Sequence, residues 1–334
     1  MNDLIRRNPV WTVVIALAAA VLLYFIVAPW SSGMEEVLGR KQIFLNAVFN
    51  GVTLGALYFL VASGFTLIFG LMKNVNLAHG SLYLLGGYLG YEVSEATGSW
   101  LFSFVVVFIA VALLGVVLQY TVFRRMEGED LRQTLVTIGI SIVLADIMLW
   151  LWGGSSYQIL SPDWLRGPVE LPLVAAVRGD DIYFLRYPSV RIAILVASIV
   201  LGILMWLALN RTRIGMLIRA GVDDRDMLAA SGVRVQIIFM VVFAFGAGLA
   251  GVAGIVGGTF QSVVAGEDMR FLLASLVVVI VGGMGSILGA ALGAVLIGLA
   301  EQLGSVYAPT YSVVFTFLIM AAVLAFRPQG LMGR

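Results

Sequence analysis

Long apolar runs recur along the whole chain and are separated by short polar segments. A helix needs about 20 apolar residues to cross a ~30 Å hydrocarbon core, and the runs reach that length. The pattern therefore predicts an all-α, polytopic transmembrane helix bundle with about 8–10 spans. The candidate spans are residues 10–29, 43–72, 79–97, 101–123, 133–152, 190–209, 235–257, 268–283, 284–304 and 309–326.

Four of these runs need comment. The run 10–29 is longer than the apolar part of a signal peptide, so it is interpreted as an uncleaved first span. As a straight helix the run 43–72 would be ~45 Å long, which predicts a strong tilt or a break at one of its glycines. Those glycines are Gly51, Gly55, Gly64 and Gly70. The segment 268–304 favours two spans, with re-entrant or broken helices around Gly282–Gly285 as the alternative.

Composition supports the membrane interpretation. The 334 residues are 61% hydrophobic and 12% charged, with a mean hydropathy of +1.02, whereas soluble domains carry about 25% charged residues. The net charge of +1 without a basic stripe argues against a nucleic-acid partner. Most Lys and Arg residues fall in loops that a cytoplasmic N-terminus would place inside, which predicts that the loop near Arg219 and the C-terminal Arg334 face the cytoplasm.

The residues needed for hydrolytic or phosphoryl-transfer chemistry are missing. The chain has one histidine and no cysteine, and its lysines, Lys41 and Lys73, do not belong to a phosphate-binding loop. We therefore predict no enzyme activity, catalytic residue, metal or cofactor. An intramembrane enzyme ranks last among the possible functions, because no catalytic constellation supports it.

Two intramembrane polar features are candidates for function. The segment Asn74–Ser81 interrupts two apolar runs and could be a hinge or a substrate contact, or a cytoplasmic turn capped by an asparagine. Within it, His79 is interpreted as a structural residue that forms a hydrogen bond. Asp146 is a carboxylate inside a candidate span, but nearby Trp150 and Trp152 favour a position close to the membrane surface.

A charged loop at residues 210–234 is predicted to be cytoplasmic and partly helical. Asp223 or Asp224 suits a helix N-cap, residues 227–231 can form one or two turns, and Gly232 can end them in the left-handed conformation. Ala229 and Ala230 then present a small-residue face that a partner's cleft could receive. An ordinary charged loop is the alternative.

At this loop the sequence resembles the permeases of branched-chain amino-acid ABC importers, the Liv-type family. Arg219-Ala220 followed by Ala229, Ala230 and Gly232 forms a comparable pattern before a Gly- and Ala-rich span. Other segments match the family in the same order over about residues 43–334: Asn50 to Tyr58, Asn76 to Gly80, Val281 to Ser286, and Arg327 to Leu331. Residues 1–42 lie outside the resemblance and predict an extra N-terminal span with a short outer loop, ahead of a permease domain at 43–334.

The resemblance implies a type II ABC importer-like fold in the bacterial inner (cytoplasmic) membrane. It also implies a second permease subunit of similar fold, two cytoplasmic ATP-binding subunits and an extracytoplasmic (periplasmic) solute-binding protein. The cargo would be a small polar solute such as a branched-chain amino acid, or a related amino acid or amide. Candidate path residues are Asn50, Thr53, Asn76 and His79; candidate ATPase-coupling residues are Arg219, Ala220, Asp223, Asp224, Ala229, Ala230 and Gly232.

The alternative from a different class is an ion-coupled secondary transporter that works without ATPases. Such a protein is expected to carry a cluster of ionisable residues within the membrane. In the sequence, Asp146 comes closest to meeting that expectation.

Overall fold

The computed structural model describes residues 20–21, 23–26, 41–72, 75–126, 128–178 and 181–333. Most of the predicted first span 10–29, together with Lys73, Asn74 and Arg334, lies outside the described residues. The chain divides into two compact units, one made of Met1–Phe49 with Pro168–Tyr187 and the other of Asn50–Gly167 with Pro188–Arg334. A domain boundary at residue 42 stays a prediction, because residues 27–40 are not described.

The smaller unit contains a two-stranded sheet that the hydrophobic pattern did not predict. Strands β1 (Pro168–Arg178) and β2 (Asp181–Pro188) pair with each other, and Arg186 and Glu170 form an ion pair of 2.9 Å across them. The first turns of α4 belong to the same unit. There Leu45 packs with Leu185, both fully buried, and the ring of Phe49 lies 5.5 Å from that of Tyr187.

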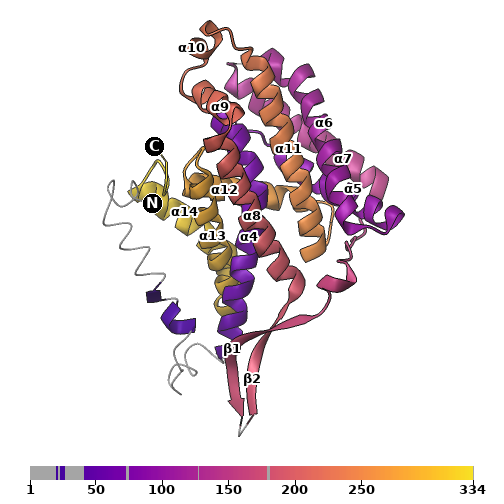
Figure 1. Ribbon diagram of the computed structural model, residues 1–334, viewed down its shortest axis with the longest axis vertical. Helices are drawn as coiled ribbons and strands as arrows, with labels where there is room; N and C mark the ends of the chain where they lie inside the picture. Colours follow the sequence, from indigo (N-terminus) through magenta and orange to yellow (C-terminus); the bar gives the residue numbers. More distant parts are fainter. Residues whose placement is uncertain are drawn as a thin grey trace. The chain divides into compact units, whose positions relative to one another are not determined.

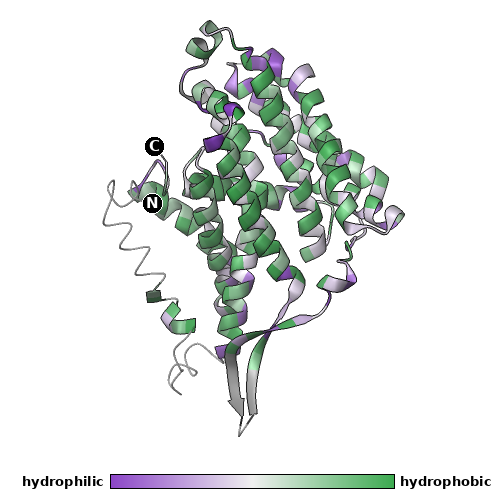
Figure 2. Ribbon diagram, in the orientation of Figure 1, coloured by the Kyte–Doolittle hydropathy of each residue, from purple (hydrophilic) through white to green (hydrophobic). Residues whose placement is uncertain are grey.

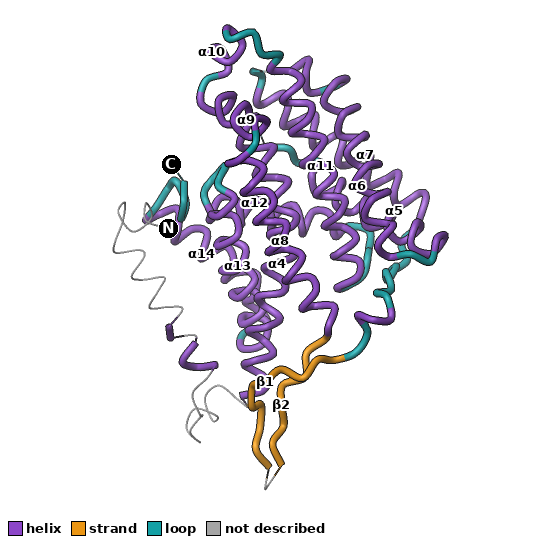
Figure 3. The backbone as a smooth tube through the Cα atoms, viewed as in Figure 1, coloured by secondary structure: helices purple, strands orange, loops and turns teal. Residues whose placement is uncertain are grey.

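The larger unit is a helix bundle with a helix at each apolar run expected from residue 43 onward (Figure 1). Its long helices are α4 (Lys41–Met72, from Asn50), α5 (His79–Thr97), α6 (Trp100–Thr121), α7 (Asp130–Trp152), α8 (Ser189–Arg211), α11 (Val235–Phe260), α12 (Glu267–Gly282), α13 (Ile287–Tyr307) and α14 (Ser312–Phe326). The short helices are η1 (Phe123–Met126), η2 (Asp163–Leu165), α9 (Arg213–Asp223), α10 (Arg225–Ala230) and η3 (Pro309–Tyr311). Apart from β1 and β2, the described elements are helical (Figure 3).

Seven segments of the described chain are long and apolar enough to cross a membrane. They are α4, α6 with η1, α7, α8, α11, α13, and η3 with α14. Hydrophobic residues make up most of these helices (Figure 2). Exposed side chains such as Leu113, Trp150, Val196 and Leu318 therefore suit contact with lipid or with another membrane subunit.

Helix α4 is continuous over 32 residues, so the expected break at a glycine is absent. Its glycines instead allow neighbouring backbones to approach closely. A Cβ on Gly55 would lie 2.7 Å from the Ala294 carbonyl oxygen, and a Cβ on Gly64 would lie 2.4 Å from that of Gly246. The glycines thus serve packing against α13 and α11, as small residues do in membrane bundles.

The tightest helix contact joins α5 to α11. A Cβ on Gly86 would lie 2.3 Å from the Cα of Gly251, and a Cβ on Gly254 would lie 2.0 Å from the Tyr83 carbonyl oxygen. Glycines on both helices therefore allow the two backbones to approach closely across the contact.

Helices α5 and α12 both begin inside the bundle. The first residue of α5, His79, bonds to the carbonyl of Val61, which lies 11 residues before the end of α4, so α5 starts ~17 Å back along α4. Helix α12 has 16 residues, which gives a length of ~24 Å against a ~30 Å core. A helix of this length spans only part of the membrane, and α12 is not among the described helices that are long and apolar enough to cross it.

Candidate functional site

The first turns of α5 and α12 meet through buried polar side chains. Ser81 on α5 donates to a carboxylate oxygen of Asp268 on α12 at 3.1 Å, and its hydroxyl lies 2.8 Å from that of Ser141 on α7. All three side chains are buried. The carboxylate also lies at the positive end of the α12 dipole, which favours its charge.

A second group of polar side chains surrounds the same turn of α12. We call it the Arg270 cluster, and it consists of Tyr58, Glu267, Arg270 and Glu301. The Arg270 guanidinium contacts Glu267 at 3.2 Å and Glu301 at 3.3 Å, while the Tyr58 hydroxyl donates to the other oxygen of Glu301 at 2.6 Å. Three helices, α4, α12 and α13, thus each supply part of one hydrogen-bonded network.

Two members of the cluster belong to helices that are long and apolar enough to cross a membrane. Tyr58 stands near the middle of the apolar span Lys41–Gly70, and Glu301 stands inside the span Ile287–Tyr307. Ionisable side chains at such positions are costly unless they pair with one another or face a watery cavity. The cluster meets the first condition through its ion pairs.

Sequence reasoning missed this cluster because its members come from three helices that are far apart in the chain. The connection from α11 to α12 runs beside α5, from Gly87 to Gly80, before α12 begins. Val263 in this connection exchanges backbone hydrogen bonds with Tyr157 and lies against Gly87 of α5. A detectable signal was Glu301, a carboxylate inside a predicted span.

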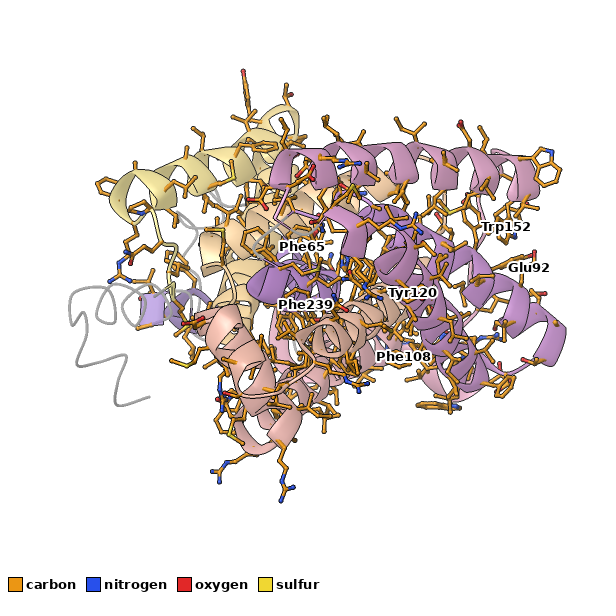
Figure 4. All side chains as sticks on the ribbon, turned by 90° about the horizontal axis from the view of Figure 1, so that it is seen from above. Phe65, Glu92, Phe108, Tyr120, Trp152 and Phe239 are labelled. Atoms are coloured by element: carbon orange, nitrogen blue, oxygen red, sulfur yellow. The ribbon has the colours of Figure 1, made fainter. Side chains whose placement is uncertain are left out.

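Asp146, which the sequence singled out instead, lies on the exposed side of α7. The predicted interfacial position agrees with its surroundings at the end of that helix. Trp152 stacks on Tyr88 with ring centroids 4.8 Å apart and donates its indole N–H to Glu92 at 2.9 Å. Trp152 and Glu92 lie side by side in Figure 4.

The four predicted path residues lie in two places. Asn50 accepts a hydrogen bond from Arg191 at the start of α8, and Thr53 is buried one turn further along α4. Asn76 and His79 are buried at the junction between α4 and α5. The side chains of Asn76 and His79 form hydrogen bonds with the backbone, and that of Asn50 forms one with Arg191.

Residues 75–78, which lead into α5, form a turn that is largely buried within the bundle. The Asn76 side chain accepts from the Ala78 N–H at 3.1 Å, and Thr137 on α7 accepts from the Leu77 N–H at 3.1 Å. The His79 ring also packs edge-on against Phe65, a residue near the middle of the bundle in Figure 4. Side chains thus satisfy the backbone groups that the turn exposes, as a membrane interior requires.

The loop 210–234 has the local structure that the sequence predicted. Helix α9 is capped by Thr212, and helix α10 is capped by Asp224, whose carboxylate accepts from the Met227 N–H at 2.9 Å. Gly232 ends the segment with φ of +82°. The side chain of Asp223, the other proposed cap, lies outside the described part of the chain.

The surface of this loop combines exposed small and apolar residues. Ala229, Ala230 and Met227 are exposed on α10, while Leu228 is buried. On α9, Ala220 is half-buried and Arg219 is exposed, and the guanidinium of Arg219 donates to the Asn210 side chain at 2.9 Å. The two short helices lie together at one end of the bundle (Figure 1).

Two sequence motifs that lie about 50 residues apart meet at the end of α12. The Leu331 N–H donates to the Val281 carbonyl at 2.8 Å, and the Met332 N–H donates to that of Gly282 at 2.9 Å. Gly330 sits against Gly283, where a Cβ would approach within 2.5 Å. The C-terminal segment therefore braces the turn that leads into α13.

Many apolar spans, helices that begin inside the bundle, and a charged cluster at membrane depth together define a membrane transport protein. Residues 47–324 match the family described as "Branched-chain amino acid transport system / permease component". Because the match covers most of the chain, the protein belongs to this family of permeases and is not an enzyme.

Relatives agree with this assignment. The chain is 28% identical to the LivH permease of the high-affinity branched-chain amino acid transport system of Salmonella typhimurium, over 87% of this chain and 96% of LivH. It is also 28% identical to the corresponding BraD permease of Pseudomonas aeruginosa, with the same coverage. Identity to the LivM permease of Escherichia coli is 25%, over 84% of this chain and 68% of LivM. No solved structure matches.

Proposed function

We propose that this chain is one of two permease subunits of an ABC importer that carries a branched-chain amino acid, or a related small amino acid or amide, across the cytoplasmic membrane. The observation that carries the proposal is the family match over residues 47–324, which spans the whole described helix bundle from α4 to α14. The energy would come from separate ATP-binding subunits, because the chain lacks a phosphate-binding loop.

The proposed partners are a second permease, two ATPases and an extracytoplasmic solute-binding protein. Similarity to both LivH and LivM supports a pair of related permease chains, since both names describe permeases of the high-affinity branched-chain amino acid system. The apolar exposed surfaces of the bundle also suit a membrane partner as well as lipid.

Helices α9 and α10 are proposed to receive the motion of the ATPases. The Asp224 cap and the Gly232 stop define a short rigid helix, and exposed Ala229 and Ala230 keep its contact face narrow. Arg219, Ala220 and Asp223 belong to the adjoining α9 and complete the proposed coupling loop. Movement of this loop would rock the bundle between conformations open to either side.

Asn50, Thr53, Asn76 and His79 remain proposed path residues. Thr53, Asn76 and His79 are buried and Asn50 is half-buried, which supports a role in holding α4, α5 and α8 in register along the path, with the turn before α5 as a hinge. Residues 1–42 are proposed to form an additional N-terminal span outside the shared permease domain.

One observation supports the alternative of an ion-coupled secondary transporter, because the Arg270 cluster is a group of ionisable residues at membrane depth.

A direct experiment separates the ABC importer from the ion-coupled transporter. The chain is co-expressed with candidate ATPase, second-permease and binding-protein subunits from the same organism, and the purified assembly is assayed for ATP hydrolysis. We expect co-purification and hydrolysis stimulated by the loaded binding protein; a chain that purifies without them and moves solute along an ion gradient would establish the alternative.

A further inference from the structure

We propose that the Arg270 cluster binds the charged end of a zwitterionic amino acid as the cargo crosses the membrane. This inference rests on the proposed function and names the site that would hold its substrate. The guanidinium of Arg270 would bind the cargo carboxylate, and Glu267 and Glu301 would bind its ammonium group.

The charges of the cluster are within reach of a ligand. The side chain of Arg270 is 43% exposed, that of Glu267 33% and that of Glu301 18%, although they lie at the depth of the apolar spans. An ion pair that served packing alone would be buried among its partners, because exposure of a charge to lipid is costly. Exposure at this depth therefore indicates a face that borders a polar path.

The charge balance of the cluster also favours a cationic group in the ligand. Two carboxylates share one guanidinium, so the cluster carries an excess negative charge when its groups are ionised. Among the residues that the structure describes, no second cation forms an ion pair with these carboxylates. The α-ammonium group of an amino acid would supply a second positive charge for the two carboxylates. The carboxylate of the amino acid would then bind Arg270.

Tyr58 holds the carboxylate of Glu301 in position to bind the ammonium group of the cargo. Its hydroxyl is held in the core of the bundle and donates to one oxygen of Glu301, while Arg270 contacts the other. Glu301 is thereby oriented by two helices other than its own. The aromatic ring of Phe271 lies 5.8 Å from the guanidinium and limits its movement further.

Apolar side chains beside the cluster suit the rest of the cargo. Met269 and Leu273 lie one turn apart on α12, next to Arg270, and are 53% and 43% exposed. A charged group flanked by apolar surface matches an amino acid with an aliphatic side chain. The same face would bind a sugar or urea poorly, because neither offers paired opposite charges.

The first test measures whether water and cargo reach this face. The parent chain has no cysteine, so Leu273→Cys introduces a single reactive thiol beside the cluster without altering a charge. Leu318→Cys on α14, a leucine 56% exposed on another helix, is the matched control. In the reconstituted importer we expect a membrane-impermeant thiol reagent to modify the α12 cysteine. We also expect the modification to become slower when free leucine is added as cargo during ATP turnover. The proposal would be overturned if neither cysteine reacts with the reagent, or if added leucine leaves the rate of modification of the α12 cysteine unchanged.

The second test measures the contribution of the charges. Arg270→Gln and Glu301→Gln each keep a polar side chain of similar size, and Arg186→Gln removes an exposed ion pair with Glu170 as the control. We expect both cluster variants to lower leucine uptake at least about tenfold while the ATPases still co-purify, with little change in the control. Wild-type uptake in both variants would refute the site. If the unmodified importer takes up neither leucine nor any other small amino acid or amide, that result would instead refute the proposed function.

Discussion

Ser81 donates a hydrogen bond of 3.1 Å to Asp268, and this contact joins the first turn of α5 to the first turn of α12. The two residues are 187 positions apart in the sequence, yet both stand where a helix begins inside the bundle. The bond therefore fixes the relative positions of the two helices that frame the interior of the permease.

Removing this bond should destabilise the folded bundle. Ser81→Ala leaves the buried Asp268 carboxylate without one of its donors, at a cost of about 1–3 kcal/mol. Ser305→Ala, which removes an exposed hydroxyl bonded to the backbone, should change stability little. Thermal unfolding of both variants in detergent measures the difference, and equal midpoints would show that the Ser81 contact is dispensable.

The close approach of α5 and α11 should make Gly86 sensitive to a single added methyl group. In Gly86→Ala the new Cβ would meet the backbone of Gly251 at 2.3 Å, so the helices must separate at a cost of about 1–3 kcal/mol. Gly139→Ala on α7 is the control, because a Cβ there meets nothing within 4 Å. Its higher helix propensity should leave stability unchanged or slightly improved. Similar losses in both variants would argue against glycine-mediated packing.

Disrupting the α9–α10 loop should stop ATPase coupling and leave the membrane bundle folded. Ala230→Trp places a bulky side chain on the exposed face of α10, and Gly232→Val strains a residue with φ of +82° by roughly 1 kcal/mol or more. Gly128→Val imposes the same kind of strain at φ of +84° in the loop before α7. We expect loss of ATPase co-purification in the α9–α10 variants only; intact co-purification and stimulated hydrolysis would make that loop a simple linker.

The distribution of arginines predicts that the α9–α10 loop faces the cytoplasm. Arg219→Cys should resist a membrane-impermeant thiol reagent in intact cells and react after the membrane is opened. Arg186→Cys, in the predicted outer segment between α7 and α8, should react in intact cells. Labelling in the opposite pattern would reverse the orientation, and each measurement is unambiguous because the parent chain has no cysteine.

The hydrophobic pattern was sufficient for the helices because each span must satisfy its own backbone in a membrane. It also gave the Asp224 cap and the Gly232 stop, since both depend on residues within a few positions of each other. It did not predict the β1–β2 hairpin, which lies between the candidate spans 133–152 and 190–209. Nor did it give the depth at which α12 begins, because the connection after α11 depends on contacts between Val263 and Tyr157, far apart in sequence.

The candidate site was harder to predict for the same reason. Glu267 and Arg270 are close in sequence, but their partner Glu301 comes from α13 and Tyr58 comes from α4. A sequence pattern contains no information on which faces of three helices meet. Asn76 and His79 were found because they share one polar segment, although the structure places them in backbone hydrogen bonds.

The central claim is that this chain forms the membrane path of an ATP-driven amino acid importer. The most direct measurement is uptake of radiolabelled leucine into proteoliposomes that contain the chain, the second permease and the ATPases, with loaded binding protein outside and ATP inside. The account predicts accumulation that requires hydrolysable ATP and stops when this chain is omitted. Accumulation that follows a proton or sodium gradient, and is the same with a non-hydrolysable ATP analogue, would contradict it.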